Sequence, residues 1–368
     1  MDRALELARQ SVGLAHPNPH VGAVLVKNGR VIGQGFHIYD DLGHAEIVAL
    51  RQARANAQAA TLYVTLEPCC HSGRTGPCTE AIIEAGVKRV VAAMPDPNPA
   101  VAGKGLTALR KARIQITAGV EEDEAQRLNE DFTRWITSGV PFVTLKAALT
   151  LDGQIAMRPR AETPITGEVA HAEVQRMRHA ADALLTGIGT VLADDPLLTD
   201  RSGLPRRRKL LRAVVDSRLR IPLKSQLVQS ADGDVVVFTT HAGGPAKARL
   251  LEKRGVEVVR TPATRGAHVD LRKVLSELGK RQVLNVLLEA GAELNGAALE
   301  AGIVDKMMLF YAPKIMGTGG VPMADMSPNW FPKSPSLSNL TLHGFGADFA
   351  VEGYFHDVYR HNGTRRKS

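Results

Sequence analysis

Cysteine is scarce in this chain of 368 residues, and its distribution is uneven. The only three cysteines are Cys69, Cys70 and Cys78, which lie together in one short segment. A secreted protein distributes paired cysteines to cross-link its loops, whereas a cytoplasmic protein keeps them reduced for metal binding or catalysis. The distribution therefore predicts a cytoplasmic protein with a metal or catalytic site in this segment.

Long apolar runs are also missing. No segment approaches the roughly 18 uninterrupted apolar residues that a membrane-spanning helix needs. The first residues, Met1 to Glu6, contain no apolar core of a secretion signal. We therefore expect no association with a membrane.

Aromatic residues make up only 4% of the chain, although its net charge is +8 and its isoelectric point is near 9.5. Surfaces that bind single-stranded nucleic acid stack the bases on aromatic side chains, so this content argues against nucleic acid as a partner. The densest basic run, residues 206–209, is typical of a solvated loop. A phosphorylated small molecule suits a basic protein equally well.

The cysteine segment is preceded by His44-Ala45-Glu46. His44, Cys69 and Cys78 can supply three ligands to a tetrahedral zinc and leave the fourth position to water, as in catalytic zinc sites. Glu46 is not needed as a ligand and is free to move protons. A histidine and glutamate of this spacing, followed by Pro-Cys and a further cysteine, are the signature of zinc-dependent nucleobase deaminases.

Two alternatives remain for this segment. Either Cys70 or His71 could close the site as a fourth ligand, which would make the zinc structural. Adjacent cysteines seldom point at one metal, so we expect Cys70 to pack in the core and His71 to contact substrate. The alternative for Glu46 is a surface glutamate in the first turn of a helix.

The length of the chain favours two domains, and the elements expected from periodicity alternate between strand and helix in both halves, which indicates α/β folds. The turn-forming residues 138–141 separate domain 1–139 from domain 140–368. In the first half we expect strands at 21–26, 31–36, 61–66, 89–93 and 114–118, and helices at 3–14, 45–56, 79–85, 104–112 and 122–137. In the second half we expect strands at 142–149, 183–186, 210–215, 235–239, 256–259, 283–288 and 306–311, and helices at 168–181, 245–254, 271–279 and 292–301.

These elements place the motif residues. His44 should lie at the entrance of a helix with Glu46 in its first turn, while Cys78 should lie at the start of the next helix, where the helix dipole stabilises a thiolate. In the second half, Gly187-Ile188-Gly189 resembles the start of a dinucleotide-binding fingerprint, but Leu192 stands where its third glycine belongs. Residues 291–296 follow a strand and open a helix, which is consistent with a phosphate-binding turn and equally with ordinary loop glycines.

Several longer motifs resemble the bifunctional riboflavin-biosynthesis deaminase–reductase family. In the first half they are Asn18-Pro19 with Val21-Gly22-Ala23-Val24, His44-Ala45-Glu46, Thr65-Leu66-Glu67-Pro68-Cys69, Gly73-Arg74-Thr75 through Pro77-Cys78, Asp96-Pro97-Asn98-Pro99 and Val101-Ala102-Gly103-Lys104-Gly105. In the second half they are Leu145-Lys146-Ala147-Ala148, Leu151-Asp152-Gly153, residues 191–199, Leu288-Glu289-Ala290-Gly291 and Ala312-Pro313-Lys314. They cover nearly the whole chain in the family's order.

The resemblance implies two folds and two activities. A cytidine-deaminase-like three-layer domain, with one zinc per chain, would deaminate a diamino-hydroxy-phosphoribosylamino-pyrimidine. A dihydrofolate-reductase-like domain would then reduce the ribose of the product to ribitol with NADPH, which would explain the incomplete fingerprint. The implied partner is therefore a phosphorylated pyrimidine, and we also expect a homo-oligomer.

The resemblance also implies site residues. Those near the deaminase substrate would be Asn18, His37, His71 and Arg74. Those near NADPH would be Ala148, Thr190, Asp194, Ser217, Gly291, Ala292, Glu293, Leu294, Asn295, Gly296 and Ala297. Those near the reductase substrate would be Glu162, Arg178, Leu198, Arg201 and Glu289; an arginine is a natural partner for a sugar phosphate.

The chain departs from the family at several positions. The family has serine at Cys70, proline at Gly76 and a larger residue at Ser72, but none of these changes removes a zinc ligand. Glu162 and Pro164 replace a substrate-contacting serine and a cofactor-packing tryptophan, which affects the details of the reductase pocket.

Two other functions compete with this interpretation. One is a tRNA-type base deaminase with a non-catalytic C-terminal domain, which the basic charge and the zinc motif suggest but which leaves residues 141–368 without a role. The other is a binding protein that keeps zinc for stability alone.

Overall fold

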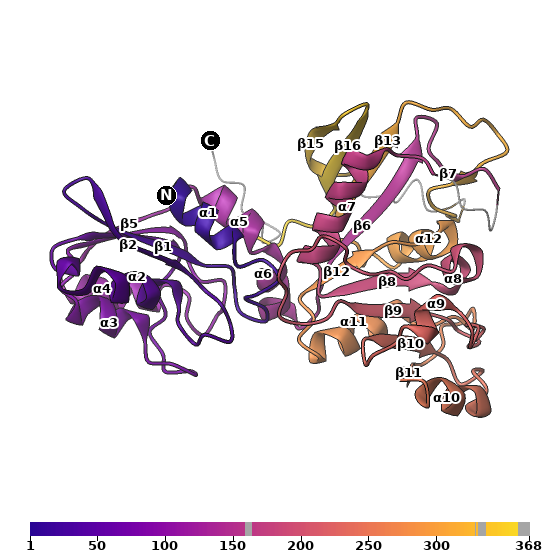
Figure 1. The fold of residues 1–368 in the computed structure, drawn as a ribbon, viewed down its shortest axis with the longest axis horizontal. Helices are drawn as coiled ribbons and strands as arrows, with labels where there is room; N and C mark the ends of the chain where they lie inside the picture. Colours follow the sequence, from indigo (N-terminus) through magenta and orange to yellow (C-terminus); the bar gives the residue numbers. More distant parts are fainter. Residues whose placement is uncertain (159–163, 328, 330–335, 360–368) are drawn as a thin grey trace. The chain divides into compact units, whose positions relative to one another are not determined.

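A computed structural model of the chain describes residues 1–158, 164–327, 329 and 336–359. The described chain forms two compact units (Figure 1). Among the described residues, unit 1 comprises Met1–Gly139, Pro205–Arg207, Val358 and Tyr359, and unit 2 comprises those within Val140–Leu204 and Arg208–Asp357. The short segment Pro205–Arg207 therefore belongs to unit 1 although it lies far beyond residue 139 in the sequence.

Unit 1 is built on a five-stranded sheet of order β2-β1-β3-β4-β5. Its strands are β1 (Gly22–Lys27), β2 (Arg30–Phe36), β3 (Thr61–Leu66), β4 (Arg89–Met94) and β5 (Gln115–Ala118). Its helices are α1 (Asp2–Arg9), α2 (Ala45–Ala53), α3 (Cys78–Glu84), α4 (Lys104–Lys111), α5 (Glu122–Leu128) and α6 (Glu130–Ser138), with a 3-10 turn at Arg54–Ala57. The strands expected at 21–26 and 31–36 form a hairpin: β1 and β2 pair antiparallel, and the two turn residues, Asn28 and Gly29, have positive φ.

Helices cover both faces of this sheet. Figure 1 shows α2, α3 and α4 together on one face and α1 with α5 on the other. Alanines of α2 and Ile82 of α3 pack with Leu25, Leu62 and Val64 in one core cluster, while Leu7 of α1 packs against Val24 in another. In β1 and β3 successive side chains belong to different clusters, Leu25 and Leu62 to the first and Val24 and Tyr63 to the second, so the sheet is the middle of three layers.

Unit 2 contains a nine-stranded sheet of order β11-β10-β9-β8-β12-β6-β13-β16-β15. Its strands are β6 (Phe142–Thr150), β8 (Ala183–Gly187), β9 (Leu211–Val215), β10 (Val235–Thr239), β11 (Val256–Arg260), β12 (Asn285–Leu288), β13 (Lys306–Ala312), β15 (Ser338–Phe345) and β16 (Asp348–Tyr354), and β7 (Gln154–Ala156) pairs separately with β14 (Val321–Pro322). Its helices are α7 (Glu168–Ala180), α8 (Ile188–Asp194), α9 (Gln226–Gln229), α10 (Pro245–Glu252), α11 (Leu271–Lys280) and α12 (Ala292–Glu300).

The strands from β11 to β13 are parallel, and β16 and β15 extend the sheet antiparallel. α11 and α12 pack on one face through Val274, Leu278 and Ala298. α10 packs on the other face through Leu251. The carboxyl ends of β6, β8, β9 and β12 consequently open on the same edge of the sheet, which is where α/β sheets bind ligands.

Two local expectations were wrong, and other elements were not expected. The first helix ends at Arg9 rather than near residue 14. The single helix expected at 122–137 is broken at Asn129, whose buried side chain accepts a hydrogen bond from the His20 amide (2.7 Å) and donates one to the His20 carbonyl (3.1 Å). The hairpin of β15 and β16 was missed altogether, and α8 was not expected.

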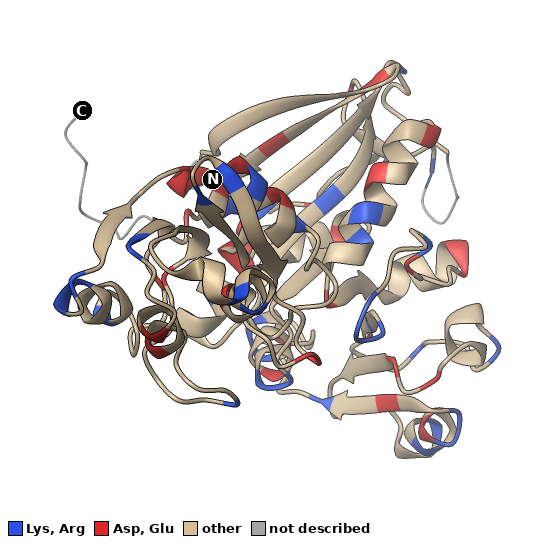
Figure 2. Cartoon of the chain, turned by 60° about the vertical axis from the view of Figure 1, so that its left-hand side comes forward, with Lys and Arg blue, Asp and Glu red and all other residues tan. Residues whose placement is uncertain are grey.

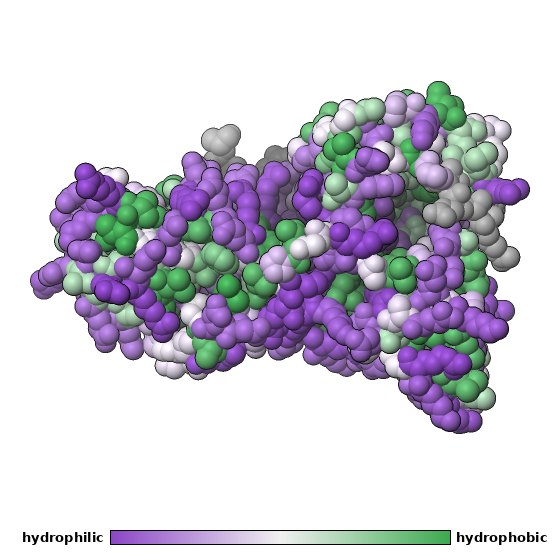
Figure 3. Space-filling model, in the orientation of Figure 1, coloured by the Kyte–Doolittle hydropathy of each residue, from purple (hydrophilic) through white to green (hydrophobic). Residues whose placement is uncertain are grey.

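One face of the molecule is mainly hydrophilic (Figure 3). Figure 3 shows hydrophilic residues over most of one face, interrupted by small hydrophobic patches, and Figure 2 shows basic and acidic residues interspersed along elements of both units. Within the described residues, no helix combines the length and the hydropathy that crossing a bilayer requires.

Candidate functional site

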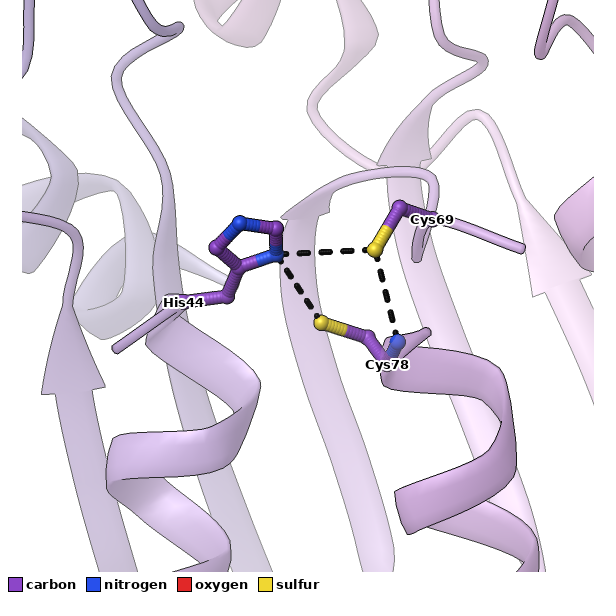
Figure 4. A group of neighbouring side chains, drawn as sticks. All are labelled: His44, Cys69 and Cys78. Atoms are coloured by element: carbon purple, nitrogen blue, oxygen red, sulfur yellow. Dashed lines mark hydrogen bonds between the residues drawn. The ribbon is translucent and has the colours of Figure 1, made fainter. Parts of the chain in front are cut away.

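Three expected zinc ligands converge in unit 1 (Figure 4). His44 is the N-cap of α2, Cys69 lies in the loop after β3, and Cys78 is the first residue of α3. The Nδ1 atom of His44 lies 3.1 Å from Sγ of Cys78 and 3.5 Å from Sγ of Cys69, and the three ligand atoms all lie within 4.8 Å of one another. One imidazole and two sulfurs at this spacing fit a tetrahedral zinc with one open position.

The surroundings favour a thiolate at this position. The Cys78 amide donates a hydrogen bond of 3.3 Å to the sulfur of Cys69, and it is one of the free N–H groups at the start of α3. The hydrogen bond from the Cys78 thiol lowers the pKa of Cys69 to about 4. The same hydrogen bond, together with burial, raises the pKa of Cys78. The pair thus holds one negative charge, which a metal cation would complement.

Glu46 lies in the first turn of α2, as expected, and is not exposed at the surface: only 4% of it is accessible. Burial raises the pKa of Glu46 to about 7, against the opposing effect of His44. A carboxyl group with a pKa near neutrality can both accept and return a proton. The charge of a bound zinc would lower this pKa.

The two possible fourth ligands do not join this cluster. Among the described residues, the group capable of holding a metal here consists of His44, Cys69 and Cys78 without Cys70 or His71. Cys70 is half-buried and His71 is exposed. This arrangement supports an open site rather than a closed one.

Glu67 fixes the loop after β3 that carries Cys69, which we call the zinc loop. Its buried carboxylate accepts hydrogen bonds from the amides of Gly103 (2.9 Å), Leu106 (3.0 Å) and Asp96 (3.1 Å). A Cβ atom at Gly105 would lie 2.0 Å from the carbonyl oxygen of Pro68, so only glycine allows α4 to approach the loop this closely. The motifs around residues 67 and 103–105 therefore support the metal ligands.

Two of the residues expected near the deaminase substrate, Asn18 and His37, are hydrogen-bonded to each other next to His44. Nδ2 of Asn18 lies 3.0 Å from Nε2 of His37, whose Nδ1 lies 3.0 Å from the Gly43 carbonyl. Since that carbonyl can only accept, Nδ1 of His37 carries the proton and Nε2 accepts from Asn18. Burial lowers the pKa of His37, which keeps it neutral beside the His44 ring, 5.4 Å away between centroids.

Arg74 and His71 are the two exposed residues among the four expected near the deaminase substrate. The Arg74 guanidinium lies over the ring of Tyr39, 4.1 Å from its centroid, and donates to the Tyr39 carbonyl (3.2 Å). Burial raises the pKa of Asp96 to about 6, and His71 is among the charges that lower it. His71 and Asp96 are therefore neighbours near Cys69.

A second group of buried titratable residues lies in unit 1, and sequence analysis missed it. Nε2 of His16 lies 3.2 Å from Oδ2 of Asp131 in α6. The imidazoles of His16 and His20 and the carboxylate of Asp131 form one cluster. Ser11 donates its hydroxyl proton to a backbone carbonyl, so Nδ1 of His20, 2.8 Å away, donates to Ser11. This cluster holds the loop that carries Asn18 against α6.

Unit 2 contains a cavity of about 1100 Å³ at the carboxyl ends of its parallel strands. Among the expected NADPH residues, its lining includes Ala148, Thr190, Asp194, Ser217, Gly291, Ala292, Glu293, Leu294 and Ala297. Among the expected substrate residues, it includes Arg178, Leu198, Arg201 and Glu289. Glu162 lies outside the described residues.

Asn295 and Gly296 do not line this cavity. Asn295 is fully buried and donates to the carbonyls of Ala290 (3.1 Å) and Met323 (2.9 Å). A Cβ atom at Gly296 would lie 1.9 Å from the Asp325 carbonyl oxygen. Both residues therefore hold the turn together, and the free amides at the start of α12, after Gly291, are the part of the turn that faces the cavity.

A charged network lies in the wall of the cavity. Arg178 donates from Nε and Nη2 to the two carboxylate oxygens of Glu289, each at 2.9 Å. Nζ of Lys146, on β6, lies 3.8 Å from the same carboxylate. Burial lowers the pKa of Lys146, against the effect of Glu289, while the two cations lower the pKa of Glu289 although burial opposes them. Sequence analysis named Lys146 only as part of a motif.

Comparison with known proteins identifies both units. The family model of the cytidine and deoxycytidylate deaminase zinc-binding region matches residues 1–94, and that of the RibD C-terminal domain matches residues 141–341. The riboflavin biosynthesis protein RibD of Aquifex aeolicus is 39% identical over 95% of this chain and 96% of its own. RibD of Escherichia coli is 42% identical over 86% and 88%.

Solved structures agree with these matches. Acinetobacter baumannii RibD superposes with a TM-score of 0.85 at 37% identity, covering 96% of this chain and 97% of the other. A Thermotoga maritima protein described as a diaminohydroxyphosphoribosylaminopyrimidine deaminase/5-amino-6-(5-phosphoribosylamino)uracil reductase gives 0.81 at 34% identity, with coverage of 96% and 97%. The expected cytidine-deaminase-like and dihydrofolate-reductase-like folds are confirmed.

Proposed function

This chain belongs to the RibD family, and from that membership we propose how its residues divide the two activities. It is a bifunctional enzyme of riboflavin biosynthesis with a zinc-dependent deaminase domain and an NADPH-type reductase domain. The deaminase comprises residues 1–139 and the reductase residues 140–368, apart from the segment Pro205–Arg207 and the residues Val358 and Tyr359, which pack in unit 1.

The substrate of the first domain is a diamino-hydroxy-phosphoribosylamino-pyrimidine, and the second domain reduces the ribose of the deaminated product to ribitol. The name of the Thermotoga maritima protein supports this order of reactions. The basic character of the chain, with a net charge of +8, suits a phosphorylated substrate. The oligomeric state remains a prediction that light scattering of the purified protein would test.

In the deaminase, His44, Cys69 and Cys78 hold zinc, which would lower the pKa of a water molecule in the open position. Glu46 accepts a proton from the attacking water on its carboxylate and returns it to the amino group that leaves as ammonia. Burial raises the pKa of Glu46 and a bound zinc would lower it, so the carboxyl group is under two opposing influences that favour both its proton-accepting and its proton-donating form. Asn18 and His37, fixed by their mutual hydrogen bond, bind and orient the pyrimidine.

In the reductase, NADPH would supply the hydride that reduces the sugar. The amides at the start of α12 bind a cofactor phosphate, because the N-terminal end of a helix attracts anions. Arg178 and Glu289 orient the sugar through their fixed bidentate pair. Lys146, whose buried ammonium has a lowered pKa, donates a proton to the ring oxygen of the ribose, which becomes a hydroxyl group as its bond to C1′ breaks and C1′ takes up the hydride.

The convergence of His44, Cys69 and Cys78 beside Glu46, in a chain that also carries a separate cavity, is the observation that supports two sites in one protein. The tRNA-type alternative has no role for the second half, which matches the RibD C-terminal domain. Removing zinc from the full-length protein with a chelator tests the division. Ammonia release should stop, while NADPH binding and reduction of the deaminated intermediate should persist. Loss of both activities together would refute two independent sites, and a salt-sensitive gel shift with tRNA would favour the alternative.

A further inference from the structure

Arg207 lies far from the zinc motif in the sequence but packs in unit 1. Its amide donates to the Gly13 carbonyl (2.8 Å) and its Nη1 donates to the His16 carbonyl (3.1 Å). Its Nε donates to the carboxylate of Asp40 (2.9 Å). The side chain is only 17% exposed. One arginine therefore joins the loop before Asn18 to the loop after His37, the two loops that carry the expected pyrimidine-binding residues.

Arg207 also shares an aromatic ring with a residue of the zinc loop. Its guanidinium carbon lies over the Tyr39 ring at 3.9 Å from the centroid, and that of Arg74 lies over the same ring at 4.1 Å. Arg74 further donates to the Tyr39 carbonyl, and the Tyr39 amide donates to Leu14 (3.2 Å). The position of Arg74 thus depends on Tyr39, whose backbone and ring are held by the segment that Arg207 fixes.

The two arginines differ in their charge partners. Arg207 is paired with Asp40. Within the described part of the chain, the guanidinium of Arg74 has a carbonyl and an aromatic ring as its partners and no carboxylate. A guanidinium that is exposed and not neutralised is suited to bind a phosphate, and the proposed substrate carries one at its sugar end.

We propose that Arg207 is a positioning residue of the deaminase, which holds Tyr39 and thereby orients Arg74 toward the phosphate of the substrate. This inference rests on the proposed function, because it assumes that Arg74 binds the phosphoribosyl substrate. It makes the segment Pro205–Arg207, encoded within the reductase half, a part of the deaminase site.

The test compares Arg207→Ala, Arg207→Lys and Arg74→Ala in the full-length protein with Arg208→Ala as the matched control. The substitution Arg208→Ala removes one positive charge from the same basic run, but the guanidinium of Arg208 donates hydrogen bonds to Gln282 in unit 2. Steady-state ammonia release gives KM and kcat for the phosphorylated pyrimidine and for the same riboside without phosphate. Zinc content and reductase activity report whether each variant is folded.

Arg207→Ala should raise KM for the phosphorylated substrate about tenfold, because it removes a cation–π contact and a charged hydrogen bond. Its kcat should stay within about twofold, since the reacting groups are untouched. The riboside without phosphate should show no change in KM. Arg207→Lys should lie between wild type and Arg207→Ala, because lysine keeps the charge but not the planar contacts. Arg208→Ala should resemble wild type.

The double variant Arg74→Ala/Arg207→Ala should be no worse than Arg74→Ala, since both residues act on one interaction. If Arg207→Ala behaves like Arg208→Ala while Arg74→Ala raises KM, the positioning role is refuted and the proposed function stands. A loss of zinc and kcat in Arg207→Ala also refutes it, because the residue is then structural. If Arg74→Ala leaves KM unchanged, the proposed role of Arg74 itself fails.

Discussion

Replacing Glu289 by glutamine removes the negative charge of the network in the reductase cavity. Glu289 accepts two hydrogen bonds from Arg178, each of 2.9 Å, and lies 3.8 Å from Lys146. The three side chains are 11%, 13% and 14% exposed, respectively. Glutamine has nearly the same shape, so packing is preserved while the two buried cations lose the carboxylate that lies between them.

The burial of the network sets the expected magnitude. Breaking a buried ion pair by removing one charge costs about 3–5 kcal/mol in the free energy of unfolding. In a domain of this size, each kcal/mol lowers the melting temperature by about 2–4 °C, so the reductase transition should fall by roughly 6–20 °C. Reduction of the sugar should also be lost, because Arg178 is no longer held by its carboxylate.

Glu257→Gln is the matched control, since Glu257 forms a similar bidentate pair with Arg281 at 2.6 and 2.9 Å. This pair is much more exposed, with 55% of the Glu257 side chain and 26% of the Arg281 side chain accessible. Exposed ion pairs contribute about 0–1 kcal/mol, so its melting temperature should barely change.

Differential scanning calorimetry of the full-length variants separates the transitions of the two units, and NADPH titration identifies the reductase transition by its ligand-dependent shift. The deaminase activity of Glu289→Gln should equal that of the wild type. If Glu289→Gln and Glu257→Gln lower the reductase transition equally, burial of the charge network does not determine its contribution and the reasoning is refuted.

Three further predictions concern unit 1. Cys69→Ser and Cys78→Ser should each lose zinc in metal analysis while Cys70→Ser retains it; an empty site in Cys70→Ser would contradict the ligand assignment. Glu46→Gln should keep zinc but lose ammonia release by about 10²–10⁴-fold, since it cannot exchange protons; activity near that of the wild type would exclude Glu46 as the proton carrier. Asp131→Asn should lower the free energy of unfolding at neutral pH by about 2 kcal/mol. The pKa of Asp131 falls from 3.8 to about 2 in the folded state, because the effect of His16 outweighs burial. That contribution to the free energy of unfolding is therefore present above about pH 4 and is lost toward pH 2. Urea unfolding should show a difference between variant and wild type at about pH 4 that disappears toward pH 2. A difference that stays constant over this range would contradict the prediction.

The sequence was sufficient to predict the zinc ligands, because their chemistry restricts the choice. Three cysteines and one His-x-Glu motif leave few combinations, and the helices expected at 45–56 and 79–85 place His44 and Cys78 at the starts of helices. The structure confirms both placements. The alternating strands and helices were likewise predictable wherever a strand is buried on both faces, as β10 is.

The features that sequence analysis missed depend on contacts between distant residues. Asn129 interrupts a pattern that is helical locally, because its side chain satisfies the backbone of His20. β15 lies at the edge of its sheet and is largely exposed, so it lacks the apolar run of a central strand. The basic segment at 206–209 was interpreted as a solvated loop, yet Arg207 is mostly buried against Tyr39 and Asp40; charge composition alone does not reveal such a partner.

The two cysteines of the zinc site explain why its chemistry is complete only with the metal. Without a cation, Cys69 and Cys78 share one proton: the hydrogen bond between them lowers the pKa of one and raises that of the other. A second thiolate in this buried position would place two negative charges within 4.8 Å of each other, beside the carboxyl group of Glu46. A bound zinc would offset this repulsion, and its binding would displace the proton of the thiol. The same positive charge also favours the ionised form of Glu46, which is the form that can accept a proton from water. One cation therefore sets the protonation of both the ligands and the acid–base group.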